Sequence, residues 1–202
     1  ELQANLSGFR DRRDRGLAGT RVAGDGTDAS LRFVHRGRWN ASLLAYLQSR
    51  AFASGFASAN DARTSVTRTL DQYSVPATGT GGRIELSSPA GSALTLRFGG
   101  DWRRVSGETH ELYSYVAGAP TRRRVAGGAA TTLGAFADAR LVRGGLTLSM
   151  GGRLDRWWIA EGRLVEAPLQ PGALITDQRF ADRQGWAPTG RGGIAVAVLH
   201  HR

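Results

Sequence analysis

The chain has 202 residues, enough for one domain or for a segment of a larger one. It contains no Cys, which excludes disulfides and thiolate metal sites. All 27 basic side chains are Arg, and the net charge of +10 raises the question of nucleic-acid binding. The Arg residues are spread about evenly along the sequence instead of gathering among aromatic residues, so we expect no nucleic-acid partner.

Hydropathy excludes a membrane helix, because no segment approaches the ~18 apolar residues in a row that such a helix needs. The mean hydropathy of -0.30 fits a soluble domain. It fits equally well a barrel whose strands present an apolar side chain to lipid at every second position. The sequence begins at Glu1 without a leader-like segment, so we expect a processed N-terminus or a piece of a longer protein.

Apolar and polar residues alternate in most of the sequence, which predicts strands with two unlike faces. In the clearest example, Leu96 and Phe98 fall on one face and Arg97 falls on the other. In chain order, the predicted strands cover 2–11, 31–36, 39–53, 83–86, 94–103, 133–141, 146–155 and 193–198. Their apolar side chains should share one surface of the sheet, and charged side chains such as Arg97 and Arg153 should share the opposite surface.

The connections between these strands alternate in length. Short turns are expected at 36–38, 88–91 and 142–145. Long polar loops are expected over about 14–27, 54–79, 105–131 and 161–186. A soluble sandwich has no reason to keep every second connection short, whereas an outer-membrane barrel has short periplasmic turns and long external loops.

The sequence therefore predicts an all-β fold, an antiparallel up-and-down meander of about eight strands that is part of a transmembrane β-barrel. Aromatic residues expected near strand ends suit the girdles at the membrane interfaces: Trp39, Tyr46, Trp102, Trp157 and Trp158. Two other architectures stay open. One is a complete small barrel of about eight strands with a structural or adhesive role, and the other is a soluble β-sandwich binding module.

Several segments carry a family resemblance. They are Gln72-Tyr-Ser-Val-Pro76, Leu96-Arg-Phe-Gly-Gly-Asp-Trp102, the hairpin from Gly134-Ala-Phe-Ala-Asp-Ala-Arg140 to Leu146-Thr-Leu-Ser-Met-Gly-Gly-Arg-Leu-Asp155, and Pro188-Thr-Gly-Arg-Gly-Gly-Ile194. Together they resemble strands and strand entries in the barrel of TonB-dependent outer-membrane receptors. Asp138 stands one position out from the Gln-Asp pair of the family's hairpin, and the spacing from Pro188 to Arg191 is one residue wider than usual.

The resemblance implies that residues 1–202 are an internal segment of a barrel of ~22 strands in the outer membrane of a Gram-negative bacterium. It implies a lumen closed by a plug, and ligand uptake energised by TonB through that plug. The plug and the remaining strands are absent from this sequence. The implied ligand is a ferric siderophore, with a saccharide or cobalamin as alternatives. The outer surface would contact outer-membrane lipid and lipopolysaccharide.

The sequence contains no catalytic motif, so we expect neither an enzyme nor a cofactor. A barrel protease or lipase would need a converging Asp/His or Ser/His group, and no pair of residues suggests one. Asp25 and Asp28 could hold Ca²⁺ in a loop, but we interpret them as part of a plain turn and expect no metal site.

The candidate ligand-binding residues fall in the predicted long loops. They are Arg68, Tyr113, Tyr115, Arg122, Arg123 and Arg124. Arginine forks bind carboxylate or phosphate in a bidentate way, and aromatic rings suit a planar, partly apolar ligand. The set therefore predicts a ferric siderophore at the barrel mouth. The arginine run also suits the phosphates of lipopolysaccharide, and a solvated loop stays open as a third interpretation.

Overall fold

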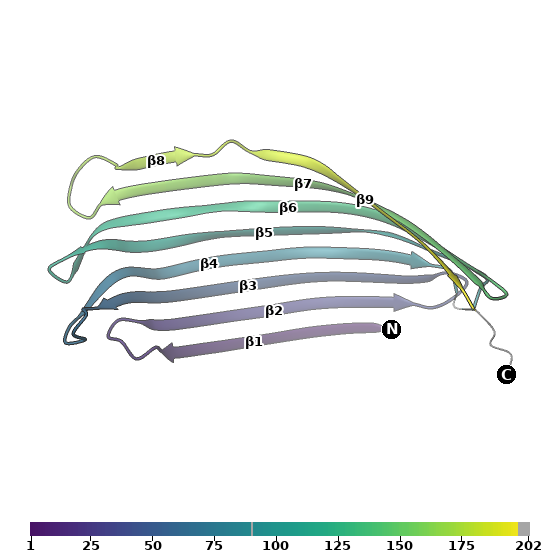
Figure 1. The fold of residues 1–202 in the computed structure, drawn as a ribbon, viewed down its shortest axis with the longest axis horizontal. Coiled ribbons are helices and arrows are strands. Elements are labelled where there is room, and N and C mark those ends of the chain that lie inside the picture. Colours follow the sequence, from purple (N-terminus) through teal and green to yellow (C-terminus); the bar gives the residue numbers. More distant parts are fainter. Residues whose placement is uncertain (90, 198–202) are drawn as a thin grey trace.

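The chain forms one antiparallel sheet of nine strands (Figure 1). The computed structural model describes residues 1–89 and 91–197. The strands are β1 (Leu2–Asp14), β2 (Arg21–His35), β3 (Asn40–Ala59), β4 (Val66–Ser87), β5 (Leu94–Val116), β6 (Ala119–Arg143), β7 (Leu146–Pro168), β8 (Thr176–Arg179) and β9 (Arg183–Val196). Strands that are neighbours in sequence pair from β1 to β7, and both β8 and β9 pair with the far edge of β7. The described residues include no helix that could cross a membrane.

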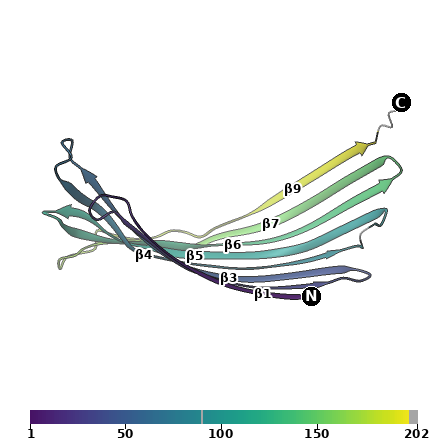
Figure 2. The same ribbon diagram turned by 90° about the horizontal axis from the view of Figure 1, so that it is seen from below.

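The predicted meander is confirmed, and one broken strand explains why nine segments appear in place of about eight. β8 pairs with 163–166 of β7, and β9 pairs with 146–159 of the same strand. The sheet is a single curved layer (Figure 2), so the β-sandwich alternative is wrong. Within the described residues β1 pairs only with β2, so this sheet does not close on itself as a complete small barrel would.

The predicted long loops are wrong, because strands continue through most of their length. β5 has 23 residues and β6 has 25. The connection between them is the two-residue turn Ala117-Gly118, with φ angles of 48° and 81°, a conformation that matches the twist of a hairpin. The hydropathy pattern disappears in these extensions because both faces are polar, while the backbone ladder continues regardless of side-chain polarity.

The asymmetry between the two ends of the sheet is nevertheless present. The short connections after β2, β4 and β6 lie at the predicted places. Residue 90, in the connection after β4, is outside the described residues, and so is residue 198 of the predicted strand 193–198. At the opposite end the strands extend far beyond their apolar part. On β5, for example, 14 residues follow Trp102 before the strand ends at Val116.

The two faces of the sheet differ as predicted in the part next to the short turns. Leu94, Leu141, Leu148 and Ile194 stand opposite one another across four neighbouring strands and therefore form one row on one face. We call this face the outer face, and the opposite one the inner face. The outer face between the short turns and the row of Trp102 carries large apolar side chains: Leu2, Leu31, Phe33, Leu43, Ile84, Leu94, Phe98, Leu133, Leu141, Leu148, Met150, Leu154 and Ile194.

We call this set the apolar belt. Its side chains are poorly covered by the rest of the chain, since Met150 is 68% exposed and Ile194 is 75% exposed. A contiguous apolar surface of this kind is unusual for a protein face in water and typical of a face in contact with lipid.

Aromatic residues mark both edges of the apolar belt. At the short-turn edge, the Trp39 ring lies 5.7 Å from the Phe98 ring, centroid to centroid. At the other edge, Trp102 and Trp186 belong to one outer-face row, and Trp158 lies in the next. These positions agree with the predicted interfacial girdles.

The girdle prediction is wrong for Tyr46 and Trp157, which lie on the inner face. Tyr46 stands opposite Gly81 and Trp157 stands opposite Gly185. A Cβ at either glycine would collide with the neighbouring ring, so each glycine makes room for an aromatic side chain on the inner surface.

Candidate functional site on the inner face

The inner face opposite the apolar belt carries a network of ion pairs that we call the inner cluster. Its four guanidinium groups and four carboxylates belong to Arg83, Arg97, Arg153, Arg191, Glu85, Asp101, Asp138 and Asp155. They come from β4, β5, β6, β7 and β9, and several of them line a recess of about 290 Å³. Four positive charges and four negative charges cancel, so the cluster as a whole is neutral.

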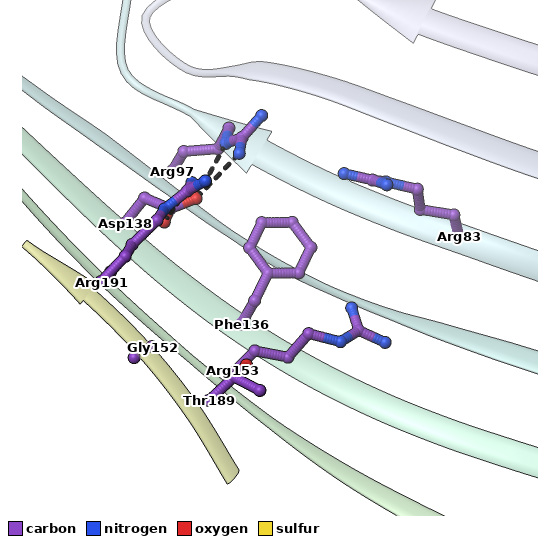
Figure 3. A pocket seen from close by; sticks show the side chains of 10 residues that line it. Arg83, Arg97, Phe136, Asp138, Gly152, Arg153, Thr189 and Arg191 are labelled. Atoms are coloured by element: carbon purple, nitrogen blue, oxygen red, sulfur yellow. Dashed lines mark hydrogen bonds and ion pairs between the residues drawn. The ribbon is translucent and has the colours of Figure 1, made fainter. Parts of the chain in front are cut away.

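Phe136 lies at the centre of this recess (Figure 3). The guanidinium carbons of Arg83 and Arg97 lie 5.1 and 5.5 Å from its ring centroid, within the range of cation–π attraction. Arg97 donates a hydrogen bond of 2.8 Å to Oδ2 of Asp138, and Arg191 donates one of 2.8 Å to Oδ1. Asp138, which lies on β6, therefore links side chains of β5 and β9, and the link to β9 crosses β7.

Arg153 connects two further carboxylates of the inner cluster, Asp101 and Asp155. Its Nη1 and Nη2 atoms donate to the two oxygens of Asp101 at 2.6 and 2.9 Å, and its Nε donates to Asp155 at 2.8 Å. Gly134 and Gly151 make this arrangement possible, because a Cβ at Gly134 would collide with the Arg153 guanidinium and one at Gly151 with the Asp138 carboxylate. Glycine is therefore required at these strand positions by the side chains that cross them.

The chemistry of the inner cluster is that of a satisfied polar wall. Each of its four carboxylates accepts a hydrogen bond from a guanidinium group. Such a surface tolerates water or a second polar protein surface without leaving an unpaired charge. It suits a lumen, and it does not resemble a site prepared for proton transfer.

A second group of inner-face side chains lies farther from the belt, and we call it the distal cluster: Gln72, Glu111, Tyr113, Arg124 and Glu166. The β5–β6 register is uninterrupted from Leu94 to Tyr113, so Glu111 falls on the same face as Arg97. Arg124 stands opposite Glu111 on one side and opposite Glu166 on the other. The register alone therefore brings a guanidinium between two carboxylates.

Arg124 is neutralised by these contacts. Its Nε donates to Glu111 at 2.7 Å, its Nη1 lies 3.4 Å from Glu166, and its guanidinium carbon lies 5.0 Å from the Tyr113 ring centroid. The other oxygen of Glu111 accepts a hydrogen bond of 2.8 Å from Gln72, and Glu111 is only 5% exposed. Burial alone would lower the pKa of Arg124, but the hydrogen bonds to Glu111 and Glu166 outweigh it and raise that pKa.

The predicted arginine run lies on β6 and not in a loop. Because successive side chains of a strand point to opposite faces, Arg122 and Arg124 lie on the inner face and Arg123 lies on the outer face. The three arginines therefore cannot bind one ligand together, as a flexible loop would have allowed.

The other three predicted residues are also on strands. Tyr113 stands opposite Arg122, and Tyr115 stands opposite Pro120 beyond a backbone irregularity at Ser114, whose φ is 58°. Arg68, on β4, forms an ion pair of 3.2 Å with Asp71 and lies against Gly19 in the β1–β2 connection. The structure thus brings Tyr113, Arg122 and Arg124 together and places Arg68 beside a different connection.

The carboxylates around Arg124 were missed in the sequence. Glu111 and Glu166 lie 13 and 42 positions from Arg124, and only the strand register makes them its neighbours. The sequence would have revealed these neighbours only if acidic residues before a hairpin turn could be aligned with basic residues after it. That alignment requires the position of the Ala117-Gly118 turn to be known first.

The interpretation of Asp25 and Asp28 as part of a turn is wrong. Both lie on β2, where Asp25 pairs with Arg10 and Arg12, and Asp28 pairs with Arg50. Three positions apart on a strand, the two carboxylates point to opposite faces and cannot share a cation. Among the described residues there is no group of three or more side chains suited to hold a metal ion.

A curved antiparallel meander with an apolar, exposed outer belt and a charged inner face defines the wall of a transmembrane β-barrel. Residues 2–198 match the family model described as TonB dependent receptor-like, beta-barrel. The chain belongs to this family. No curated protein matches the sequence.

A solved structure with a similar fold is the ferric yersiniabactin uptake receptor FyuA from Yersinia pestis. The sequence identity is 15%, the TM-score is 0.55, and the match covers 87% of this chain and 25% of that receptor. At this identity the likeness concerns the fold alone. The chain spans about a quarter of the length of the receptor it matches.

Proposed function

We propose that the chain is a wall segment of an outer-membrane receptor that imports a small-molecule ligand by active transport, and that the receptor is not an enzyme. The observation that carries this proposal is the contrast between the exposed apolar belt on one face and the neutral, hydrogen-bonded inner cluster on the other. Membership of the TonB-dependent receptor family supports the transport role.

The asymmetry of the sheet supports a location in the outer membrane of a Gram-negative bacterium. Barrels of that membrane have short turns on the periplasmic side and extended structure outside. Here the apolar belt lies next to the short turns, and β5 and β6 extend far beyond its opposite edge. We therefore place the Ala117-Gly118 turn outside the cell.

The energy source in this proposal is TonB, acting through a plug inside the lumen. The plug and the remaining strands of the barrel are not part of the 202 residues. The inner cluster is the surface that such a plug would face. Because its charges already cancel within the wall, a plug could move against it without leaving a buried unpaired charge.

The ligand in this proposal is a ferric siderophore, bound at the outer end of the inner face. Tyr113 and Arg122 are the leading contacts, because Arg122 is exposed and both side chains lie on the inner face. Tyr115 and Arg68 remain secondary candidates. Arg124 serves to hold the wall through Glu111 and Glu166, and Arg123 faces outward, where lipopolysaccharide is its available partner. The arginine fork and the aromatic ring support this ligand class, and a saccharide or cobalamin are the alternatives.

Uptake of radiolabelled ligand by cells that produce the full-length receptor tests the proposal. Cells with and without TonB are offered a catecholate ferric siderophore, a maltooligosaccharide and cobalamin in parallel. We expect surface binding of the chelate in both strains and accumulation only in the strain with TonB. Accumulation without TonB would contradict the energised mechanism. Uptake of only the saccharide or only cobalamin would show that this compound, and not a ferric siderophore, represents the ligand class.

A further inference from the structure

One arginine interrupts the outer face where the apolar belt meets the polar surface. Arg156, on β7, stands opposite Leu133 on one side and Trp186 on the other. The preceding outer-face residue of the same strand is Leu154, which belongs to the apolar belt. The guanidinium of Arg156 is therefore at the edge of a lipid-facing surface and not in the lumen.

Two indole rings hold this guanidinium. Its carbon lies 5.1 Å from the Trp186 ring centroid and 5.4 Å from the Trp158 ring centroid. Nη2 of Arg156 also donates a hydrogen bond to the amide oxygen of Gln184. Stacking on aromatic faces orients an arginine fork without neutralising its charge.

The charge of Arg156 has no counterion within the described part of the chain. Its contacts are two rings and a neutral amide. Arg153 and Arg97 on the inner face each bind carboxylates, and the nearby outer-face residue Arg104 binds Glu161 at 2.6 Å. A fixed cation at an apolar edge is stabilised by an anion from outside the chain.

The position of Arg156 indicates which anion this is. Its row, shared with Trp102 and Trp186, lies at the edge of the belt away from the short turns, which is the edge of the outer leaflet in the proposed orientation. Aromatic girdles lie at the level of lipid headgroups. The anionic group available at that level is the phosphate of a membrane glycolipid, and an arginine fork matches phosphate geometry.

We propose that Arg156, Trp158 and Trp186 form a binding site for the phosphate of an outer-leaflet lipid, with the fork of Arg156 on the phosphate oxygens and the indole rings against the headgroup. The site rests on the outer-membrane orientation proposed above. It is separate from the transport path, because Arg156 and the inner cluster lie on opposite faces of β7.

Titration of the purified full-length receptor in detergent micelles tests the site. The probes are diphosphorylated lipid A, the same lipid without phosphates, and inorganic phosphate, with tryptophan fluorescence and calorimetry as readouts. For Arg156→Gln we expect about tenfold weaker binding of the phosphorylated lipid, equivalent to about 1.4 kcal/mol. The affinity of Arg156→Lys for the phosphorylated lipid should lie between those of the wild type and Arg156→Gln, because lysine keeps the charge and lacks the fork.

Arg103→Gln is the matched control. Arg103 is an exposed neighbour of Trp102, but it lies on the inner face, so the control should bind the lipid as the wild type does. A heat-dependent mobility shift establishes that each variant forms the barrel.

Equal binding by Arg156→Gln and wild type would overturn the proposal, and so would equal binding of the two lipids by the wild-type receptor. Saturation of the site by inorganic phosphate alone would also overturn it, since the lipid would then not be the ligand. Uptake of the transported ligand, measured on the same variants, should be unchanged. If the wild-type receptor bound the phosphorylated lipid but transported no ligand, the proposed function would be refuted and the lipid site would still be supported.

Discussion

The two faces of the sheet at the level of the apolar belt are built from the same strands and behave in opposite ways. On the outer face, Met150 and its neighbours have little of their surface covered by the chain itself. On the inner face of the same strand, Arg153 makes short contacts with Asp101 and Asp155. The charges of the inner cluster are paired within the described residues, whereas the outer surface depends on the surrounding lipid.

This difference has an energetic consequence. A substitution on the outer face changes the interaction of the protein with its environment, while a substitution on the inner face changes contacts between strands. The same chemical change should therefore have different costs on the two faces, and the outcomes can be ordered by size.

The largest effect is expected for Met150→Arg. Met150 lies near the middle of the apolar belt on β7, so an arginine there would sit near the bilayer midplane at a cost of about 2–4 kcal/mol. The measurement is the urea unfolding of the full-length receptor after refolding into lipid vesicles.

Thr147→Arg provides the control for that experiment. Thr147 is on the same strand but on the inner face, where a guanidinium meets water, so the unfolding free energy should change by less than about 1 kcal/mol. Equal costs at the two positions would mean that the assignment of the faces is wrong.

The next effect concerns the inner cluster. Arg153→Met removes the partner of two carboxylates, and the loss of one partner of a fully buried pair costs about 3–5 kcal/mol. The Arg153 side chain is 32% exposed, which screens the charges left behind, so we expect about 2 kcal/mol in the same unfolding assay.

Arg191→Met is the comparison for Arg153→Met. Arg191 donates a single hydrogen bond to Asp138, its side chain is 71% exposed, and Asp138 keeps its contact with Arg97. Its removal should cost less than about 1 kcal/mol. A larger loss for Arg191→Met than for Arg153→Met would contradict the view that burial determines the strength of these pairs.

The contrast between the faces also explains which strands, and which side of the sheet for each residue, could be predicted from the sequence. Where one face is apolar, as in Leu94 to Trp102, the alternation predicted both the strand and the side of each residue, and the structure confirms them. In 39–53 the signal was ambiguous because Leu43, Leu44 and Leu47 place apolar residues on both faces, and Tyr46 was consequently assigned to the wrong surface.

The distal half of the sheet could not be predicted for a related reason. The segment around Arg122 to Arg124 is polar on both faces, so its hydropathy is that of a loop although its backbone is paired on both sides. Partners such as Glu111 and Glu166 follow from the register, which the turn at Ala117-Gly118 determines. A two-residue turn of Ala and Gly within a long polar stretch is a weak signal on its own.

A third prediction extends the two-face comparison to this distal half, under the proposed function. Arg122→Gln should weaken binding of an anionic ferric chelate to the full-length receptor by up to tenfold, because it removes an inner-face charge at the mouth. Arg123→Gln, on the outer face, should leave chelate binding unchanged. The assay is equilibrium binding of labelled chelate to outer membranes. Equal effects of the two substitutions would mean that the arginine run 122–124 is a solvated surface without a role in binding.

The smallest effect concerns Asp25, on the outer face beyond the apolar belt, where the surface is in water and ion pairs replace lipid contacts. The hydrogen bond from Arg12 is the main cause that lowers the pKa of Asp25 below its ordinary value of 3.8, with a further contribution from Arg10. Since the folded-state pKa is depressed, the stabilisation is present above the unfolded-state pKa and is lost as the pH falls through the folded-state value.

Wild-type receptor should therefore unfold at a slightly higher urea concentration than Asp25→Asn at neutral pH. The difference should shrink as the pH falls below about 4, where an ordinary Asp is protonated in the unfolded chain. Asp61→Asn, in the β3–β4 connection, is the control, because Asp61 forms no ion pair within the described residues. A difference for Asp25→Asn that stays constant down to the lowest accessible pH would show that the carboxylate charge has no part in holding β1 to β2, and that the backbone ladder alone holds the two strands together beyond the belt.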